Sequence, residues 1–283
     1  MNENQLTSVP SELGDLTSLT QLFLHGNKLT NLPAELGLLA NLTVLYLHEN
    51  QLTSVPSELG NLSSLTELHL SGNKLNSLPA GFIFLTNLTV LTLNENQLSS
   101  VPLALGNLAS LTTLHLQRNR LTSLPAELGL LSSLERLYLN ENQLTSVPSE
   151  LGDLTSLTQL FLHGNKLTNL PAELGLLANL TVLYLHENQL TSVPSELGNL
   201  SSLTELHLSG NKLNSLPAGF IFLTNLTVLT LNENQLSSVP LALGNLASLT
   251  TLHLQRNRLT SLPAELGLLS SLERLYLNEN QLT

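Results

Sequence analysis

The chain has 283 residues, no cysteine, and 21 aspartate and glutamate residues against 10 lysine and arginine residues, which gives a formal net charge of −11 at pH 7. The lack of cysteine excludes disulfide bonds and thiolate metal sites. The acidic balance also lacks the positive field that nucleic-acid binding requires, so we expect partners that are neutral or basic.

The beginning of the chain, residues 1–5, is polar and acidic, whereas a secretory signal starts with basic residues and continues with an apolar run. The most apolar stretch, residues 80–85, is much shorter than the roughly 18 residues of a membrane-spanning helix. We therefore expect no signal peptide and no membrane span. The sequence is compatible with the cytoplasm or with recombinant expression, and it indicates no location.

A nine-residue stretch returns every 23 residues from Leu19 to Leu272, and at Leu157 to Asn165 it reads Leu-Thr-Gln-Leu-Phe-Leu-His-Gly-Asn. A fixed period of this length is typical of a solenoid, in which each coil contacts only its neighbours. We expect one solenoid over residues 1–283, with 11 full repeats and a partial repeat at each end.

Each coil contains one predicted strand. In the coil that begins at Leu65, Leu68 and Leu70 alternate with Glu67 and His69, which is the period of a strand with one buried face. A single coil cannot bury its own leucines, so neighbouring coils must cover one another. The strands therefore stack into a parallel sheet.

The ninth position of the repeat is always asparagine. An amide can donate and accept hydrogen bonds, so it can satisfy backbone groups where the chain leaves the strand. We interpret the series as a buried structural ladder, and a polar binding stripe is the alternative. The first seven full members are Asn27, Asn50, Asn73, Asn96, Asn119, Asn142 and Asn165.

The return side of most coils reads Pro-x-Glu-Leu-Gly, as in residues 171–175. Proline suits the first helical position and glutamate the first turn, and glycine suits an exit that needs positive φ. This pattern predicts one helical or 3₁₀ turn.

The complete pattern L-x-x-L-x-L-x-x-N-x-L-x-x-[LV]-P-x-E-L-G-x-L-x-x resembles the leucine-rich repeat family, specifically its 23-residue intracellular class related to Ras-binding proteins. The resemblance covers essentially the whole chain. It implies an α/β solenoid, curved as a horseshoe, with a parallel β-sheet on the concave face and short 3₁₀ or helical turns on the convex face. It also implies a usual role in binding other proteins.

One turn departs from the pattern in each half, at residues 81–84 and 219–222, which both read Gly-Phe-Ile-Phe. Isoleucine replaces the exit glycine, and a β-branched residue does not tolerate positive φ, so we expect this turn to be rebuilt. Phe84 and Phe222 are expected to be buried in a thicker convex layer. An exposed hydrophobic contact patch is the alternative.

Residues 2–139 are identical to residues 140–277. Because natural duplicates accumulate substitutions, this identity favours a designed or engineered protein over a recent tandem duplication. The chain begins and stops inside a repeat without a polar capping coil, so Leu6 and Leu275 should be poorly covered. We expect self-association through these ends.

All eight histidines fall in or next to the predicted strands. His25 and His48 share a repeat position in adjacent coils, as do His163 and His186, so strand spacing would place each pair about 4.8 Å apart, within reach of one metal ion. These are weak candidates, because a polar strand surface explains them equally well. No catalytic motif or phosphate loop occurs, so we expect no cofactor and no enzymatic activity.

The fifth repeat position projects from the concave sheet and carries aromatic residues in several coils. We predict a protein- or peptide-binding surface centred on Tyr138, Phe161 and Tyr184, because stacked exposed aromatics are typical hot spots. Further candidates on this surface are Arg136, Val182, Phe23 and Tyr46. The sequence thus indicates a non-catalytic interaction scaffold, engineered and without a dedicated natural ligand. The alternatives are a natural intracellular protein-binding domain and a self-assembling structural solenoid.

Overall fold

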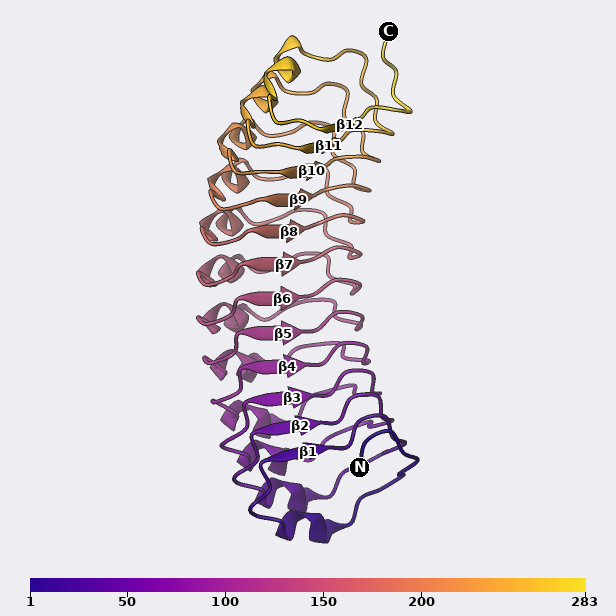
Figure 1. Cartoon of the computed structure of the whole chain (residues 1–283), viewed down its shortest axis with the longest axis vertical. Coiled ribbons are helices and arrows are strands. Elements are labelled where there is room, and N and C mark those ends of the chain that lie inside the picture. The colour runs from indigo at the N-terminus through magenta and orange to yellow at the C-terminus, as the bar shows by residue number, and fades with distance from the viewer. The chain divides into compact units, whose positions relative to one another are not determined.

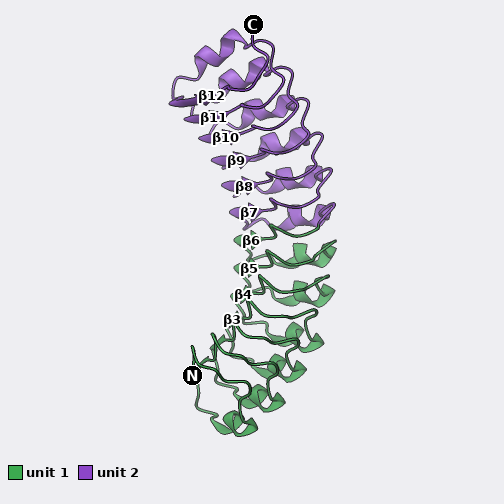
Figure 2. Cartoon of the chain, turned by 90° about the vertical axis from the view of Figure 1, so that its right-hand side faces the viewer, with its two compact units in different colours: residues 1–143 green, residues 144–283 purple.

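The computed structural model describes all 283 residues, and the chain forms two compact units, Met1–Gln143 and Leu144–Thr283. Figure 2 shows that in each unit the strands line one face and the short helices line the opposite face. We call these the strand face and the turn face.

Each coil contributes one three-residue strand, and the strands of a unit pair in parallel in chain order (Figure 1). In the first unit they are β1 (Gln21–Phe23), β2 (Val44–Tyr46), β3 (Glu67–His69), β4 (Val90–Thr92), β5 (Thr113–His115) and β6 (Arg136–Tyr138). In the second they are β7 (Gln159–Phe161), β8 (Val182–Tyr184), β9 (Glu205–His207), β10 (Val228–Thr230), β11 (Thr251–His253) and β12 (Arg274–Tyr276).

Each coil also contains one 3₁₀ helix of five residues. The first unit has η1 (Ser11–Asp15), η2 (Ala34–Leu38), η3 (Ser57–Asn61), η4 (Ala80–Phe84), η5 (Leu103–Asn107) and η6 (Ala126–Leu130). The second has η7 (Ser149–Asp153), η8 (Ala172–Leu176), η9 (Ser195–Asn199), η10 (Ala218–Phe222), η11 (Leu241–Asn245) and η12 (Ala264–Leu268). None of these helices has the length and apolar character needed to cross a membrane.

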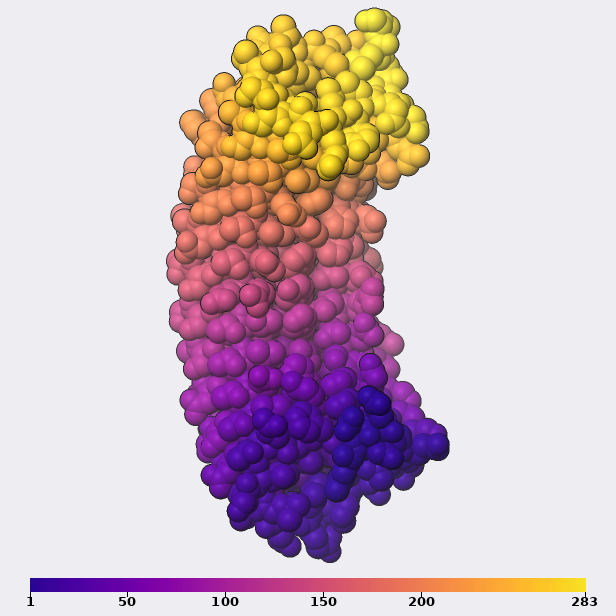
Figure 3. Space-filling model, in the orientation of Figure 1, coloured from indigo at the N-terminus to yellow at the C-terminus, as the bar shows by residue number.

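Strand pairing keeps equal repeat positions side by side. Leu22 pairs with Leu45 and Phe23 with Tyr46, so each leucine of the inner row lies on the next one. The core lies between the two faces: Leu68 and Leu70 are 0% exposed, and Phe82 and Leu85 close it from the turn side. The space-filling view shows the coils of each unit lying directly on one another (Figure 3). The predicted α/β solenoid, with a parallel sheet on one face and short 3₁₀ turns on the other, is confirmed.

The role predicted for the exit glycine is wrong. Gly37 lies inside η2 without positive φ, and the proline before the helix is its N-cap residue instead of its first helical residue. Glycine is needed at this position because a Cβ atom there would overlap the Glu58 carbonyl oxygen of the next coil. Close stacking of successive turns, and not the direction of the chain exit, therefore selects glycine.

The turn that contains Gly-Phe-Ile-Phe, residues 81–84, is not rebuilt, so this second prediction is also wrong. η4 is a five-residue 3₁₀ helix like the others, because the position taken by Ile83 never required positive φ. Its glycine has moved to Gly81, where a Cβ atom would overlap the Ser57 carbonyl oxygen. η4 packs against η3 as closely as other neighbouring turns do, but less closely against η5, where Ile83 takes the place of the glycine that normally faces the next coil.

The prediction that Phe84 and Phe222 are buried is also wrong. Their exposed fractions are 63% and 64%. Phe82 fills the core position that leucine occupies in the other turns, whereas Phe84 is the last residue of η4 and faces solvent, as Leu38 does in η2. The alternative expectation, an exposed apolar patch, agrees with this exposure.

Positive φ occurs at a position that the sequence pattern did not single out. The residue before each ladder asparagine is left-handed, and it is glycine in some coils, such as Gly72, and glutamate or arginine in others, such as Glu49 and Arg118. The turn out of the strand therefore requires this conformation even where the side chain opposes it.

Candidate functional site

The strand face carries two outward columns of rings in each unit. Successive side chains of a strand point to opposite sides, so the fifth repeat position lies outside while the leucines on either side of it point into the core. The seventh position, just after the strand, lies next to the fifth. Apart from Tyr276, which is exposed, the rings of both columns are half-buried by their neighbours, and the rest of each ring is open to solvent.

Five rings of three adjacent coils form what we call the ring cluster. In the first unit it consists of Phe23, His25, Tyr46, His48 and His69, and in the second of Phe161, His163, Tyr184, His186 and His207. The phenyl ring of Phe161 meets Tyr184 edge to face at 5.0 Å between ring centres, and Phe23 meets Tyr46 at the same distance.

The histidines hold this cluster together. His25 stacks on His48 with ring centres 4.4 Å apart and planes 9° from parallel, and Tyr46 meets His69 at 4.3 Å. The second unit repeats the arrangement, with 4.3 Å between His163 and His186. The sequence pattern predicts the aromatic column and the histidine pairs as separate features. Their adjacent repeat positions on one face are the signal that could have joined them.

A carboxylate orients the tyrosine of each cluster. The hydroxyl group of Tyr46 donates a hydrogen bond to Glu67 Oε2 at 3.1 Å, and that oxygen lies 3.4 Å from His69 Nε2. In the second unit Tyr184 donates to Glu205 at 3.0 Å. Because the hydroxyl group is tied to the next coil, the tyrosine ring is held in one orientation, which lowers the entropy lost when a partner covers it.

Two imidazoles of each cluster, those of His48 and His69 in the first unit and of His186 and His207 in the second, have pKa values below the usual value for histidine. For His48 burial lowers the pKa most and the neighbouring His25 lowers it further, against the opposing effect of Glu49. For His69 burial also outweighs the hydrogen bond to Glu67. The pKa of Tyr46 is raised, by burial first and by Glu67 second. At neutral pH His48 and His69 are thus uncharged rings, and His69 lies beside the Glu67 carboxylate.

The remaining predicted binding residues lie on the same face of their units. Phe161, Tyr184 and Val182 belong to the second unit, where Val182 is half-buried at the start of β8. Tyr138 belongs to β6 of the first unit, where it stacks on His115 at 4.2 Å with planes 8° from parallel. Arg136, at the start of the same strand, is exposed.

The geometry of the histidine pairs disfavours the weak metal candidates. A metal ion must lie near the plane of each imidazole that binds it. The parallel rings of His25 and His48, and those of His163 and His186, direct their nitrogens into separate stacked planes. No group of three or more histidine and carboxylate side chains lies close enough together to complete a metal site.

The ladder asparagines form a hydrogen-bonded stack behind the strand face. The amide of Asn96 donates to the carbonyl oxygens of Leu93 in its own coil and Leu70 in the previous coil, both at 3.0 Å, and accepts from the Leu75 amide at 2.9 Å. Its exposed fraction is 7%, so the amides are structural and offer no binding surface.

Comparison with known proteins agrees with this architecture. A family model described as leucine rich repeat matches residues 17–75, 40–98, 63–121 and 109–167, and one described as leucine-rich repeat region matches residues 173–282. A search of curated protein sequences finds no significant match.

Three similar solved structures differ in source. A leucine-rich repeat protein of Leptospira interrogans is 40% identical, with a TM-score of 0.80 over 99% of this chain and 77% of that one. An internalin of Listeria monocytogenes is 30% identical, with a TM-score of 0.71 over 97% and 84% of the two chains. The plant peptide hormone receptor RGFR1, solved in complex with RGF2, is 31% identical, with a TM-score of 0.76 over 97% of this chain and half, 50%, of that one.

The repeated 23-residue coil, the buried asparagine stack, the family models and the likeness of 99% of this chain to a bacterial repeat protein lead to one assignment. The chain belongs to the leucine-rich repeat family.

Proposed function

We propose that this protein is a non-catalytic interaction scaffold that binds an extended peptide or a protein loop across its strand face. The observation that carries the proposal is the ring cluster, which occurs in both units with the same contacts. Rings held by their neighbours and open on one side are the usual energetic centre of a protein interface. The similar plant receptor is named as a peptide hormone receptor, which supports the same use of this fold.

The charges next to the ring cluster indicate what kind of partner fits it. Glu67 and Glu205 lie beside the rings, and the chain as a whole is acidic, with a net charge of −11. A lysine or arginine next to an aromatic side chain would contact both the carboxylate and the ring faces. Phe161 and Tyr184 of the predicted centre are retained in this proposal as the site of the second unit, with Phe23 and Tyr46 as the equivalent site of the first unit. Tyr138 is a separate candidate on the strand face of the first unit.

The test starts from a displayed library of random short peptides selected on the immobilised chain. Because the ring cluster occurs twice, both copies must be changed, so we choose Phe23→Ala together with Phe161→Ala. The affinity of the selected peptide should fall by more than about 2 kcal/mol, roughly 30-fold. Glu127→Ala, in η6 on the turn face, is the control. A peptide whose affinity is unchanged by the double substitution would refute the strand-face proposal.

Self-association is a second candidate function, supported by one edge of the second unit. β12 is paired by β11, and its core residue Leu275 is 41% exposed, whereas Leu252 in β11 is 0% exposed. Leu6 is half-buried, because the amide of Glu3 and the carbonyl group of Leu6 pair with the coil of β1. Light scattering across concentration should show association that Leu275→Glu abolishes. A monomer at all concentrations would refute it.

The complete identity of residues 2–139 and 140–277 supports an engineered origin, because separately evolving copies acquire substitutions. A recent tandem duplication is the alternative. The coding sequence distinguishes them: a recent duplication has the same codons in both halves, whereas a synthetic gene is recoded to avoid direct repeats.

A further inference from the structure

The turn face has an apolar feature that folding does not explain. Among the residues of η4, Phe82 fills the core and Gly81 permits close packing on η3, so both have structural roles. Phe84 has none, since it is 63% exposed at a position where η3 and η5 carry asparagine. Phe222 of η10 repeats this exposure in the second unit.

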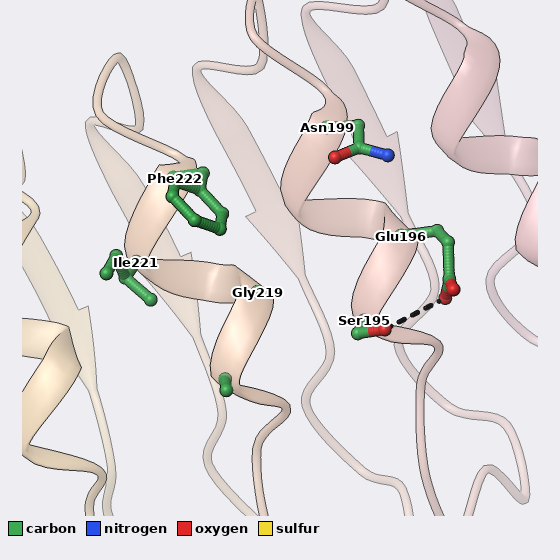
Figure 4. A pocket seen from close by; sticks show the side chains of 7 residues that line it. Ser195, Glu196, Asn199, Gly219, Ile221 and Phe222 are labelled. Atoms are coloured by element: carbon green, nitrogen blue, oxygen red, sulfur yellow. Dashed lines mark hydrogen bonds between the residues drawn. The ribbon is translucent and has the colours of Figure 1, made fainter.

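Phe84 forms one wall of a groove between η3 and η4. The hollow has a volume of about 450 Å³ in the first unit, and its counterpart between η9 and η10 has about 460 Å³. Figure 4 shows the second copy, in which the ring of Phe222 leans over the space toward η9 and Glu196 lies on the opposite side. Ile221 also lines this hollow.

The groove continues into the preceding coil, which contains η2. A smaller hollow of about 220 Å³ lies between η2 and η3, and it shares Glu58 and Asn61 with the larger one. Leu38, 57% exposed, lines its far side. The two hollows together, with Leu38 at one end and Phe84 at the other, are called the turn-face groove. The second unit has the same pair, joined by Glu196 and Asn199.

The charges of the groove are all negative. Glu35 and Glu58 are the charged residues that line it in the first unit, and Glu58 accepts a hydrogen bond from the Ser57 hydroxyl group at 3.1 Å. No lysine or arginine lines either hollow to neutralise them. An occupant that fits must therefore supply both a positive charge and an apolar side chain.

The length of the groove indicates the form of that occupant. It spans three coils, and the strand spacing of about 4.8 Å per coil gives it a minimum length of roughly 10 Å, which is about three residues of extended chain. In an extended chain, residues two apart point to the same side and lie roughly 6.6 Å apart. One such pair can place an apolar side chain against Phe84 and a cation beside Glu58.

We propose that the turn-face groove binds an extended peptide segment that presents an apolar side chain and, two residues away, a lysine or arginine. Phe84 covers the apolar side chain, and Glu58 and Glu35 receive the cation. The site is separate from the ring cluster and occurs once in each unit, at residues related by the 138-residue duplication.

The probe is a fluorescein-labelled peptide in which leucine and lysine alternate at every second position, with serine between them. Its fluorescence anisotropy should saturate with the wild-type chain. Phe84→Asn combined with Phe222→Asn should weaken binding at least about tenfold. This change introduces asparagine, which η3 and η5 already carry at the same position as Asn61 and Asn107, so the fold should be preserved. Circular dichroism checks that the variant is folded.

Further variants separate the two parts of the proposal. Glu58→Gln with Glu196→Gln should weaken binding and remove most of its salt dependence, and a probe with glutamate in place of lysine should not bind. Leu130→Asn, at the same turn position but outside the groove, is the matched control and should change nothing. Phe23→Ala with Phe161→Ala on the strand face should also leave this binding unchanged.

Three outcomes would overturn the proposal. These are absence of saturable binding to the wild-type chain, binding that is indifferent to the phenylalanine pair, and binding that is lost with the strand-face variant instead. The last outcome would assign the probe to the ring cluster. Failure of the turn-face groove is thus distinguishable from failure of the strand-face proposal.

Discussion

At the scale of single residues, the ladder asparagine closes each coil. The side chain of Asn96 satisfies backbone groups of its own coil and of the previous one, where the chain leaves the strand. Buried backbone groups without partners are costly, which explains why this position does not vary among the coils.

We expect Asn96→Ala to lower the free energy of unfolding by about 1–3 kcal/mol, because it leaves the buried Leu75 amide without a partner, whereas the Leu70 and Leu93 carbonyl oxygens keep the hydrogen bonds from the neighbouring ladder asparagines. Urea denaturation followed by circular dichroism measures the change. Asn107→Ala, at an exposed position of η5, is the control and should cost less than about 0.5 kcal/mol. Equal losses in the two variants would show that burial of the amide is unimportant.

At the scale of elements, the 3₁₀ helices show what could be predicted from the sequence. The proline and the leucine spacing identified one turn per coil, because both act within a single coil. The reason for glycine depended on the next coil, since the missing Cβ atom of Gly37 makes room for the Glu58 carbonyl oxygen. A one-dimensional pattern does not contain that distance, and the same gap explains the wrong expectation for Phe84.

Two glycines test this explanation. Gly37→Ala should destabilise the chain by more than about 2 kcal/mol, because the added methyl group meets the backbone of the next coil. Gly267 occupies the same place in η12, but no atom lies within 4 Å of its Cβ position. Gly267→Ala should therefore be neutral within about 0.5 kcal/mol. Thermal unfolding of both variants measures the two losses of stability. A large loss of stability for Gly267→Ala would show that glycine is needed for its backbone conformation and not for close packing.

The ring cluster predicts a pH dependence of stability. The pKa values of His48 and His186 are lowered in the folded chain, mainly by burial, so the unfolded chain takes up protons first as the pH falls. Stability is present above the unfolded value of about 6.5 and is lost below it. His25 and His69 oppose protonation of His48, whereas Glu49 favours it.

Replacing His48 and His186 by glutamine, which Gln117 and Gln255 carry at the same repeat position, should make this loss smaller. The loss of stability is measured as the fall of the urea midpoint from about pH 8 to about pH 5, since histidine titrates between these values. The wild-type midpoint should fall further than that of the variant. An equal or smaller fall in the wild-type chain would contradict the assignment of the lowered pKa values.

At the scale of the molecule, the repeat predicted the architecture of each unit, since every coil uses the same leucine and asparagine positions. The sequence also placed Phe161 and Tyr184 on one face, but it did not reveal how the histidines join them. That arrangement depends on ring orientations, such as the stacking of His163 on His186, which side-chain packing decides.

The coil-by-coil construction of the core predicts unequal costs for equal substitutions. Leu252, covered by strands on both sides, is 0% exposed, whereas Leu275 in β12 is 41% exposed. Leu252→Ala should cost about 2–5 kcal/mol and Leu275→Ala less than about 1 kcal/mol. Urea denaturation compares them, and equal costs would mean that burial by neighbouring coils does not set the stability.

The most direct test of the interaction-scaffold account is the stoichiometry of binding. Isothermal titration with the selected short peptide should give two equivalent sites on the wild-type chain, because each unit carries one ring cluster. Phe161→Ala should leave one site, and Phe23→Ala with Phe161→Ala should leave none. Unchanged stoichiometry in both variants would contradict the account.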